Sequence, residues 1–344
     1  MKARKKVINT GVTPSTDHAG DTDDKNNIRP LSLREYIGQE RVKNEIAVYI
    51  QSSKIQGRPL GHVLLSGPPG LGKTTMARII ANELGAKITE VSGPSITMPG
   101  EVASILVNQT DGSVVFIDEI HSMDRTAMEM LYSAMEDYKI NITVGNKESA
   151  GAKTVSIDTA KFTLIGATTK EGSLTRPLRD RFAIKEHMEY YSEEELSAIV
   201  KRAASCYDVS IDDDSCIVVA KMSRGTPRVA NQILYRLANF SIAQNGSVID
   251  ADYARETIRG MGIDDEGLDV LDRRMLRTII NNFNGGPVGI DTLAASMEAD
   301  VQTLEDAHEP YLLMTGYIER TPRGRIATDK AKKHVEKWSY IDGA

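Results

Sequence analysis

The chain has little of several features that define other classes of protein. It contains only two cysteines, and neither Cys206 nor Cys216 belongs to a C-x-x-C pair or a His/Cys cluster, so we expect buried reduced thiols rather than a disulfide or a metal site. No apolar run approaches the roughly 18 residues that a membrane span needs, and the basic first residues are not followed by the apolar segment of a signal peptide. These absences predict a cytoplasmic protein without a membrane segment.

The chain also lacks a positive net charge. Its formal charge of −6 argues against non-specific adhesion to nucleic acid, although a local basic patch is not excluded. Apolar residues make up 40% of the sequence, which is ample for well-packed cores. A length of 344 residues predicts two or three domains.

A complete phosphate-binding motif is the most informative feature that is present. Residues 67–75 fit the pattern G-x-x-x-x-G-K-[ST], and they lie between an apolar segment typical of a buried strand and a segment with helical periodicity. In such a loop the backbone N–H groups turn toward the phosphates, the lysine reaches the β- and γ-phosphates, and the next hydroxyl binds Mg²⁺. The residues expected at the nucleotide are Gly70, Gly72, Lys73, Thr74 and Thr75, with Thr74 as a metal ligand.

A second element favours hydrolysis of the bound nucleotide. Residues 113–117 form an apolar segment typical of a strand, and two carboxylates, Asp118 and Glu119, follow it. In a parallel sheet this arrangement brings the first carboxylate beside the phosphate loop. We expect Asp118 to hold Mg²⁺ and Glu119 to polarise the attacking water. A strand that simply ends in polar residues is the plain alternative.

The pattern of the chain predicts a tail and three domains. Residues 1–27 are polar, which is typical of a disordered tail. Residues 28–187 alternate strand and helix patterns, as expected of a parallel α/β sheet. Residues 188–260 are helical throughout, and a capping box from Ser192 to Glu195 opens the first helix. Residues 261–340 predict three helices and a two-stranded wing, which is the organisation of a winged-helix DNA-binding domain.

The individual elements follow from the same periodicities. Strands are expected near Val63, Ile88, Val114 and Thr163, with a β-hairpin over residues 139–158 and the wing over residues 317–327. Helices are expected over residues 41–51, 74–84, 126–137, 269–282, 290–297 and 301–315.

The wing carries a local excess of positive charge that contrasts with the acidic chain. Between residues 319 and 337 there are seven basic residues and three acidic ones. We expect Arg320, Arg323 and Arg325 to contact DNA phosphates, whereas a solvated face explains the following lysines equally well. The segment has no interleaved aromatic residues, which predicts contact with the DNA backbone rather than base stacking.

Two further segments place arginines where phosphoryl chemistry needs positive charge. They are Leu178-Arg-Asp-Arg-Phe182 and Arg224-Gly-Thr-Pro-Arg228. Arginine suits this task because its planar guanidinium can neutralise several phosphoryl oxygens at once. A single arginine near a loop is usually solvated, so these segments gain meaning only together with the phosphate loop and the acidic pair.

The motifs taken together resemble those of AAA+ ATPases and, within them, the RuvB family of bacterial Holliday-junction branch-migration motors. The resemblance runs from about residue 28 to residue 337 in the order that the family has. The matching segments are Arg29-Pro30, Tyr36-Ile-Gly-Gln39, residues 67–75, Asp118-Glu-Ile-His121, Ala134-Met-Glu-Asp-Tyr138, Gly166-Ala-Thr-Thr169, residues 178–182 and 224–228, Gly285-Gly-Pro287, and Arg320-Thr-Pro-Arg-Gly-Arg325.

The resemblance implies both a fold and an activity. The fold is α/β: a AAA+ P-loop domain with a parallel sheet, then a helical lid domain and a winged-helix domain. The activity is hydrolysis of ATP with Mg²⁺ by a homohexameric ring, which pulls DNA and drives branch migration in recombination and repair. The implied partners are DNA, as four-way junctions and duplex arms, the junction-binding protein RuvA, which docks on the hairpin over residues 139–158, and RuvC.

The resemblance also assigns roles to particular residues. Thr169 is the polar sensor that orients water, Arg228 is the lid arginine that reports the γ-phosphate, and Arg181 is a finger given to the neighbouring subunit. The residues implied at the adenine end of the nucleotide are Ile28, Arg29 and Tyr191. The residues implied near the nucleotide at the subunit interface are Glu136, Asp137 and Tyr138.

Three other functions remain open on the sequence alone. A AAA+ clamp loader or protein remodeller would share the ATPase core and the fingers, but it would not need a basic wing. A DExH helicase is suggested by residues 118–121, but its second half should be another α/β sheet rather than a helical lid with Arg228. A DNA-binding switch without hydrolysis is disfavoured by the intact Glu119.

Overall fold

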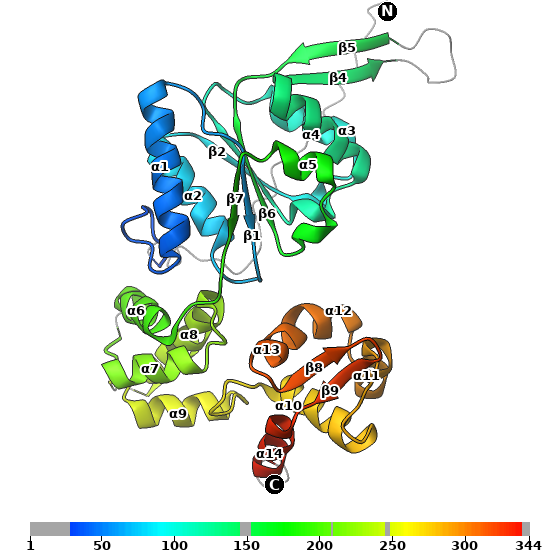
Figure 1. Cartoon of the computed structure of the whole chain (residues 1–344). Coiled ribbons are helices and arrows are strands. Elements are labelled where there is room, and N and C mark those ends of the chain that lie inside the picture. The colour runs from blue at the N-terminus through cyan, green and yellow to red at the C-terminus, as the bar shows by residue number, and fades with distance from the viewer. Residues whose placement is uncertain (1–27, 145–152, 208, 245–247, 339–344) are drawn as a thin grey trace, which may run out of the picture.

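The chain folds into three units that follow one another in the sequence (Figure 1). A computed structural model describes residues 28–144, 153–207, 209–244 and 248–338. The expected tail over residues 1–27 and the tip of the expected hairpin at residues 145–149 lie outside these ranges. In order, the units are a sheet domain, a helical lid domain and a winged domain, so the predicted fold class is confirmed.

The sheet domain is built on five parallel strands in the order β2-β3-β6-β1-β7. Their bounds are β1 (Val63–Ser66), β2 (Ile88–Ser92), β3 (Val114–Asp118), β6 (Thr163–Thr168) and β7 (Ile184–His187). The central strands β1 and β6 are buried along their whole length, as expected of a parallel sheet covered on both faces. Four of these strands were predicted, but the edge strand β7 was not.

Helices cover both faces of this sheet (Figure 1). On one face lie α1 (Glu40–Gln56) and α2 (Lys73–Leu84), and on the other lie α3 (Pro99–Val107), α4 (Arg125–Asp137) and α5 (Arg176–Arg181). Short 3₁₀ turns, η2 (Gly93–Ser95), η3 (Ile120–Ser122) and η4 (Glu171–Ser173), connect them. The predictions for α1, α2 and α4 are confirmed, and α3 and α5 were not predicted.

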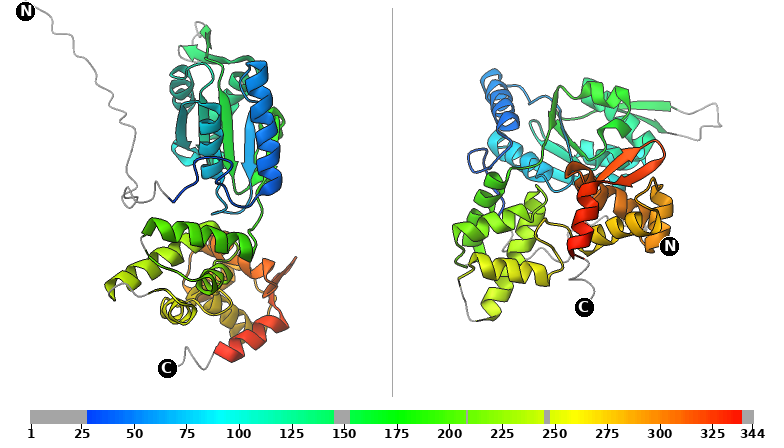
Figure 2. Two further views of the ribbon diagram at one scale, coloured as in Figure 1. Left: turned by 90° about the vertical axis from the view of Figure 1, so that its left-hand side faces the viewer. Right: turned by 60° about the horizontal axis from the view of Figure 1, so that its bottom comes forward.

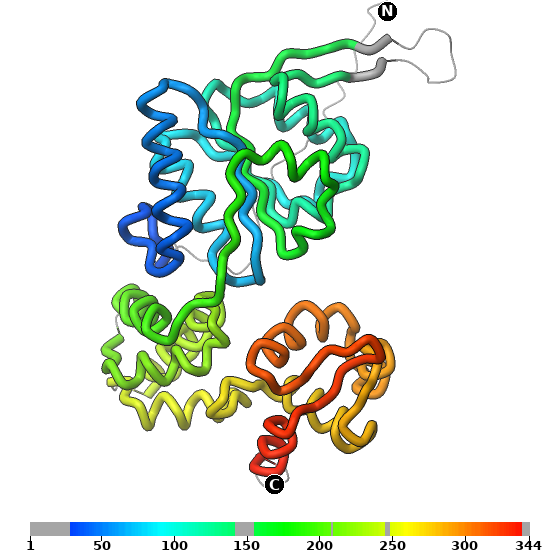
Figure 3. Tube along the Cα trace, viewed as in Figure 1, coloured from blue at the N-terminus to red at the C-terminus, as the bar shows by residue number. Residues whose placement is uncertain are grey.

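The predicted β-hairpin projects from the sheet domain (Figures 1 and 3). It consists of β4 (Lys139–Val144) and β5 (Lys153–Asp158), which pair antiparallel from Lys139 opposite Asp158 onward. Its base is fixed by Ile140, which is fully buried in the core beneath α4.

The lid domain contains α6 (Glu193–Ala204), η5 (Ser205–Tyr207), α7 (Asp213–Lys221), α8 (Pro227–Ala243) and α9 (Ala251–Gly260). The predicted capping box is present, because the Glu195 amide donates to the Ser192 hydroxyl and the Ser192 amide donates to the Glu195 carboxylate. Cys216 is buried and Cys206 is half-buried, and the structure does not join them in a disulfide. Of the two thiols expected to be buried, only Cys216 is fully so.

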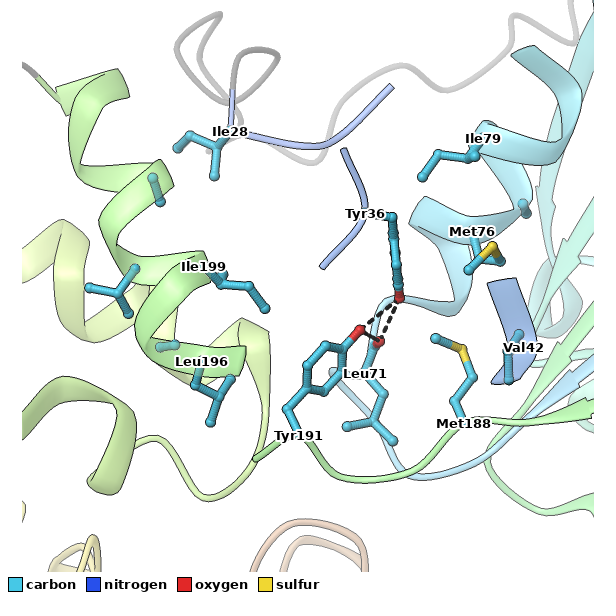
Figure 4. Close-up of a cluster of buried hydrophobic side chains, with 14 of the residues drawn as sticks. Ile28, Tyr36, Val42, Leu71, Met76, Ile79, Met188, Tyr191, Leu196 and Ile199 are labelled. Atoms are coloured by element: carbon cyan, nitrogen blue, oxygen red, sulfur yellow. Dashed lines mark hydrogen bonds between the residues drawn. The ribbon is translucent and has the colours of Figure 1, made fainter. Parts of the chain in front are cut away.

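A continuous apolar core joins the sheet domain to the lid (Figure 4). Leu71 and Met76 lie on the sheet side of this core, and Leu196 and Ile199 of α6, with Ile28 beside this helix, lie on the lid side. The Tyr191 hydroxyl bridges the two sides, at 2.8 Å from the Tyr36 hydroxyl and 3.1 Å from the Leu71 carbonyl. The lid is therefore packed directly against the loop that precedes α2.

The winged domain has a core of its own. It contains α10 (Val270–Arg277), a π-helical turn (Thr278–Asn282), α11 (Ile290–Met297), α12 (Val301–Thr303), a second π-helical turn (Leu304–His308) and α13 (Glu309–Met314), then the wing strands β8 (Ile318–Thr321) and β9 (Gly324–Ala327), and α14 (Asp329–Trp338). The predicted wing is confirmed. The closing helix α14 was not predicted, and it buries Val335 and Trp338. Two further views show the winged domain beside the lid and below the sheet (Figure 2).

None of the helices in the described part of the chain combines the length and the apolar character needed to cross a membrane.

Candidate nucleotide-binding site and DNA-contact surface

The phosphate loop connects the end of β1 to the start of α2. Gly67, Gly70 and Gly72 have φ values of 133°, 83° and 97°, a region that residues with a side chain rarely adopt. A Cβ atom on Gly67 would lie 2.4 Å from the Met188 carbonyl oxygen. Glycine is therefore required here both by the backbone conformation and by the close approach of the segment that leads to the lid.

Lys73 is folded over this loop. Its ammonium group donates to the carbonyls of Gly67 at 2.7 Å and Pro68 at 2.8 Å. Burial lowers the pKa of Lys73, and the carboxylates of Glu119 and Asp118 oppose this effect, while the charge of Arg228 adds to it. The two acidic residues and the lid arginine are thus electrostatically coupled to the lysine that is expected to meet the phosphates.

Asp118 lies at the end of β3, at the same edge of the sheet as the phosphate loop. Its Oδ2 atom accepts a hydrogen bond of 3.2 Å from the Thr74 hydroxyl, and its Oδ1 atom accepts from the Glu119 amide at 3.0 Å. Hydroxyl and carboxylate oxygens are the ligands that Mg²⁺ prefers in proteins. The two residues expected to hold the metal are therefore brought together with suitable chemistry.

Glu119 has an unusual backbone conformation for a residue with a side chain. Its φ of 49° lies in the left-handed region, where strain is common at functional sites. The Oε2 atom accepts from the Thr169 amide at 3.3 Å and from the Thr169 hydroxyl at 3.2 Å. His121 is also 3.2 Å from this oxygen and 2.9 Å from the Thr168 hydroxyl. The expected sensor, Thr169, thus holds the expected catalytic carboxylate, and His121 is a neighbour to which the sequence assigned no role at the site.

The lid meets the phosphate loop through the first turn of α8. The Arg228 amide donates to the Gly70 carbonyl at 3.3 Å, and a Cβ atom on Gly70 would lie 3.1 Å from the Arg228 Cβ. The Arg228 side chain is exposed on this side of the loop. The lid arginine of the sequence analysis therefore lies beside the loop that should carry the phosphates.

Of the three residues implied at the adenine end, Tyr191 lies at the phosphate loop, with its hydroxyl 3.1 Å from the Leu71 carbonyl, whereas the Ile28 carbonyl accepts a hydrogen bond from Arg202 of α6 at 2.6 Å. Ile28 and Tyr191 are buried, and Arg29 is half-buried. Burial raises the pKa of Tyr191 to about 12, so its hydroxyl stays protonated as a hydrogen-bond donor. Tyr36 completes this group, because its hydroxyl donates to the Leu71 carbonyl at 3.2 Å. The sequence offered Tyr36 only as part of a matching segment and assigned it no role.

Arg181 lies at the opposite edge of the sheet from the phosphate loop of its own chain. It comes just before β7, whose first residue, Ile184, pairs with Val63 at the start of β1. The phosphate loop begins only after Ser66, at the far end of β1. Because β1 has 4 residues, the two edges are separated by about 13 Å at about 3.3 Å per residue.

One of the residues expected at a subunit interface, Glu136, pairs directly with Arg181. Its guanidinium forms an ion pair of 3.0 Å with Glu136, donates to the Tyr132 carbonyl at 3.2 Å and lies over the Tyr132 ring. Asp137 is exposed, and Tyr138 packs edge-on against Phe162 at 6.0 Å between ring centroids. Glu136 and Arg181 are thus brought together, away from the nucleotide residues of the same chain, and Asp137 and Tyr138 directly follow Glu136 at the end of α4.

The three wing arginines are not equivalent. The side chain of Arg320 is 63% exposed and Arg323 is exposed, whereas the side chain of Arg325 is only 7% exposed. The Arg325 guanidinium pairs with Glu309 through two hydrogen bonds of 2.9 Å and 2.6 Å, and Glu305 lies 3.2 Å away. Arg325 is therefore not presented to solvent in this structure, because two carboxylates of its own domain already hold it, and its contact with DNA phosphates stays a prediction.

Comparison with known proteins agrees with this architecture. The description "Holliday junction DNA helicase RuvB P-loop domain" matches residues 28–188, "RuvB AAA lid domain" matches residues 191–264, and "RuvB C-terminal winged helix domain" matches residues 265–336.

Relatives and solved structures give the same result. The chain is 47% identical over 322 residues to the "Holliday junction branch migration complex subunit RuvB" of Staphylococcus haemolyticus, with 94% of this chain and 97% of the relative covered. It is also 47% identical to the protein of that name from Clostridium kluyveri, with 95% of this chain and 92% of the relative covered. The structure of the Thermotoga maritima RuvB Holliday junction branch migration motor has a TM-score of 0.81 and 46% identity, covering 90% of this chain and 98% of that one. The chain therefore belongs to the RuvB family of P-loop ATPases.

Proposed function

We propose that the protein is an ATP-driven DNA motor that moves Holliday junctions during recombination and repair. The observation that carries this proposal is the position of the Glu119 carboxylate, which Thr169 holds beside a complete phosphate loop. The backbone of Glu119 is in the left-handed region, where strain is common at functional sites. A nucleotide switch without turnover has no need for such a carboxylate. The relatives are named as branch migration subunits, and the winged domain supplies a surface for binding DNA.

In the proposed reaction, Lys73 and the backbone of the phosphate loop bind the phosphates of ATP. Thr74 and Asp118 hold Mg²⁺, which would neutralise charge on the phosphates. Glu119 orients the attacking water, and Thr169 keeps the carboxylate in place. Arg228 adds positive charge from the lid, so closure of the lid depends on the γ-phosphate.

The position of Arg181 supports a ring in which neighbouring subunits share each site. Because the length of β1 separates Arg181 from the phosphate loop of its own chain, Arg181 cannot reach the nucleotide bound there. An arginine finger that does reach the γ-phosphate raises the rate of hydrolysis by about 10³- to 10⁵-fold. We propose that Arg181, with Glu136, Asp137 and Tyr138, faces the ATP of the next subunit in a homohexamer. In this arrangement Arg181 would leave Glu136, with which it pairs in the single chain.

The DNA contact is proposed for Arg320 and Arg323 at the exposed edge of the wing. Both would neutralise phosphates on four-way junctions and duplex arms without reading sequence. We further propose RuvA as a partner on the β4–β5 hairpin, RuvC as a second partner at the junction, and the cytoplasm as the location.

The function is tested by ATP hydrolysis and strand exchange on a synthetic four-way junction. For the unaltered protein, we expect the junction together with RuvA to stimulate ATPase activity, and we expect branch-migrated duplexes to be released. The Glu119→Gln variant should show neither the stimulation nor the release. A linear duplex without RuvA serves as the control for simple DNA stimulation. If protein substrates stimulate hydrolysis and junctions with RuvA do not, the clamp loader or remodeller takes the place of the motor.

A further inference from the structure

The winged domain is joined to the rest of the chain in a different way from the lid. One apolar core spans the sheet domain and the lid, whereas the core of the winged domain starts only at Leu268. Among the described residues, ion pairs connect three places in the chain to the same short stretch of the winged domain, residues 304–309, which we call the coupling segment. These places are Lys170 of the sheet domain, Asp272 of α10, which also pairs with Arg224 of the lid, and Arg325 of the wing. Charge-assisted hydrogen bonds are directional, so those that cross between domains can fix the orientation of one domain relative to another.

The first contact begins at Arg224, in the loop that leads into α8. Arg224 has a φ of 52°, and its guanidinium pairs with Asp269 at 2.8 Å and with the fully buried Asp272. It also donates to the Gly267 carbonyl at 3.0 Å. Burial raises the pKa of Asp269, but the charge of Arg224 and the hydrogen bonds to the carboxylate together outweigh this effect and hold the pKa below its usual value. Arg224 thus ties the lid to the first helix of the winged domain.

Asp272 passes this contact on to the coupling segment, because its second carboxylate oxygen lies 2.7 Å from Nδ1 of His308. Asp269, Asp272 and His308 are close enough to share a metal ion. However, the Arg224 guanidinium already pairs with both carboxylates, so we interpret the cluster as a structural link between domains.

The loop that carries Arg224 also touches the nucleotide site. The Gly225 carbonyl accepts a hydrogen bond from the Tyr191 amide at 2.9 Å, and the Arg228 amide donates to Gly70 of the phosphate loop at 3.3 Å. A short stretch of backbone therefore has the phosphate loop at one end and the winged domain at the other. Movement of Arg228 toward a γ-phosphate would displace Arg224 as well.

The second contact comes from the sensor strand. Lys170 directly follows Thr169, and its backbone amide donates to the Thr168 hydroxyl at 3.0 Å. Its ammonium group crosses to the winged domain and pairs with Asp306 of the coupling segment at 3.2 Å. Both side chains are about half exposed, so this pair contributes little to stability, but it connects the residue that follows the sensor to the winged domain.

The third contact leads from the coupling segment to the wing. Glu309 holds Arg325 of β9 through two hydrogen bonds, and Glu305 lies 3.2 Å from the same guanidinium. Arg325 on β9 lies directly opposite Arg320 on β8 in the register of the wing strands, and Arg320 is one of the two proposed DNA contacts. Residues 304–309 are thus connected to the lid loop, to the sensor and to the wing.

We propose that the coupling segment transmits the nucleotide state to the DNA-binding wing, with Arg224 as the positioning residue that links it to the lid. The inference rests on the proposed motor function, in which each ATP cycle must change the hold on DNA. Coupling between two sites is commonly worth about 5- to 150-fold in affinity.

The test compares the Kd of the full chain for a fluorescent duplex in the presence of ADP and of a non-hydrolysable ATP analogue. We expect the ratio of these two Kd values to differ from one by at least about fivefold in the unaltered protein. It should fall to within about twofold of one in Arg224→Lys, which keeps the charge but loses the planar fork. Nucleotide affinity should stay within about twofold in this variant, because the phosphate loop and Arg228 are unchanged.

Exposed residues provide a second arm that does not depend on how well an Arg224 variant folds. Asp306→Lys should reduce the Kd ratio, and adding Lys170→Glu should restore it by re-forming the pair with reversed charge. Lys201→Ala, which removes an exposed ion pair within the lid, is the matched control and should leave the ratio unchanged.

The two arms separate the inference from the proposed function. An unchanged ratio in both folded Arg224→Lys and Asp306→Lys would overturn the coupling through this segment while leaving the motor in place. A ratio of one in the unaltered protein would overturn the coupling and also the requirement that each ATP cycle changes the hold on DNA. If the full chain did not bind DNA with either nucleotide, both the coupling and the proposed motor function would be overturned.

Discussion

The nucleotide site and the wing show how differently two sequence motifs translate into structure. At the nucleotide site, the residues of the phosphate loop and of the acidic pair converge: Lys73, Thr74 and Asp118 lie within one network of contacts. In the wing, three arginines of a single motif separate, because Arg320 and Arg323 are exposed and Arg325 is buried. A phosphate loop fixes its own geometry through backbone conformation, whereas a run of charge does not say which of its members face solvent.

The pairing within the wing explains this separation. Arg320 and Arg325 stand directly opposite each other on β8 and β9, so they share one face of the hairpin, where two like charges repel. Glu309 relieves the repulsion by taking Arg325 into a bidentate pair, and it lies 3.9 Å from Arg320. One arginine thus becomes part of the fold and its neighbour remains available.

The largest expected effect concerns Arg181 and would extend the comparison to a third arginine. Arg181→Ala should retain ATP binding but lower kcat by about 10³- to 10⁵-fold, because the neighbouring site loses its finger. Mixing this variant with Lys73→Ala should partly restore hydrolysis, since some interfaces then combine an intact loop with an intact Arg181. ATPase assays on co-assembled mixtures provide the measurement. Inactive mixtures in rings that contain both variants would mean that Arg181 acts within its own chain.

Within the nucleotide site, binding and turnover should be separable. Glu119→Gln should bind ATP normally, because Lys73, Thr74 and Asp118 are intact, but its kcat should fall by about 10²- to 10⁴-fold. Lys73→Ala should instead fail at binding. Fluorescent-nucleotide titration and steady-state hydrolysis distinguish the two, and near-normal turnover in Glu119→Gln would remove this carboxylate from the mechanism.

Most of the fold could be predicted from the sequence because its signals are local. Strand β1, the phosphate loop and α2 follow one another without a break, and a capping box marks the start of α6. Helix α5 could not be predicted in the same way, since it is short and buries only Leu178. The edge strand β7 has only two buried residues, which gives little apolar signal.

The contacts at the site were predictable where they follow from the order of the motifs in the sheet, and not where they depend on how separate elements pack. The partners of Glu119 could be expected from the order of motifs, because β3 and β6 are neighbours in a parallel sheet. The partner of Arg325 could not, since Glu309 lies on a helix whose packing against the wing depends on the tertiary fold. The same holds for Lys170 and Asp306, which are distant in sequence and belong to different domains.

The buried arginine of the wing should matter for stability. Arg325→Ala leaves Glu309, which is only 3% exposed, without its charge partner, so we expect the free energy of unfolding of the winged domain to fall by about 3 kcal/mol. Arg323→Ala, at an exposed position of the same wing, is the control and should change it by less than about 0.5 kcal/mol. Urea unfolding followed by tryptophan fluorescence suits this test, because the only tryptophan, Trp338, is buried in the winged domain. If the two variants were equally stable, the pair between Arg325 and Glu309 would not contribute to the stability of the winged domain.

The smallest expected effect is on DNA binding by the exposed arginines. In the double variant Arg320→Ala/Arg323→Ala, affinity for duplex DNA should fall by a similar factor for every sequence. The dependence of log Kd on log salt should decrease by about two, because each arginine neutralises one phosphate. Basal ATPase activity should not change, because neither side chain belongs to the nucleotide site. Binding isotherms at several salt concentrations on unrelated duplexes provide the measurement. If the weakening depended on sequence, these arginines would read bases rather than phosphates, and the wing would act as a recognition element instead of a general contact with the DNA backbone.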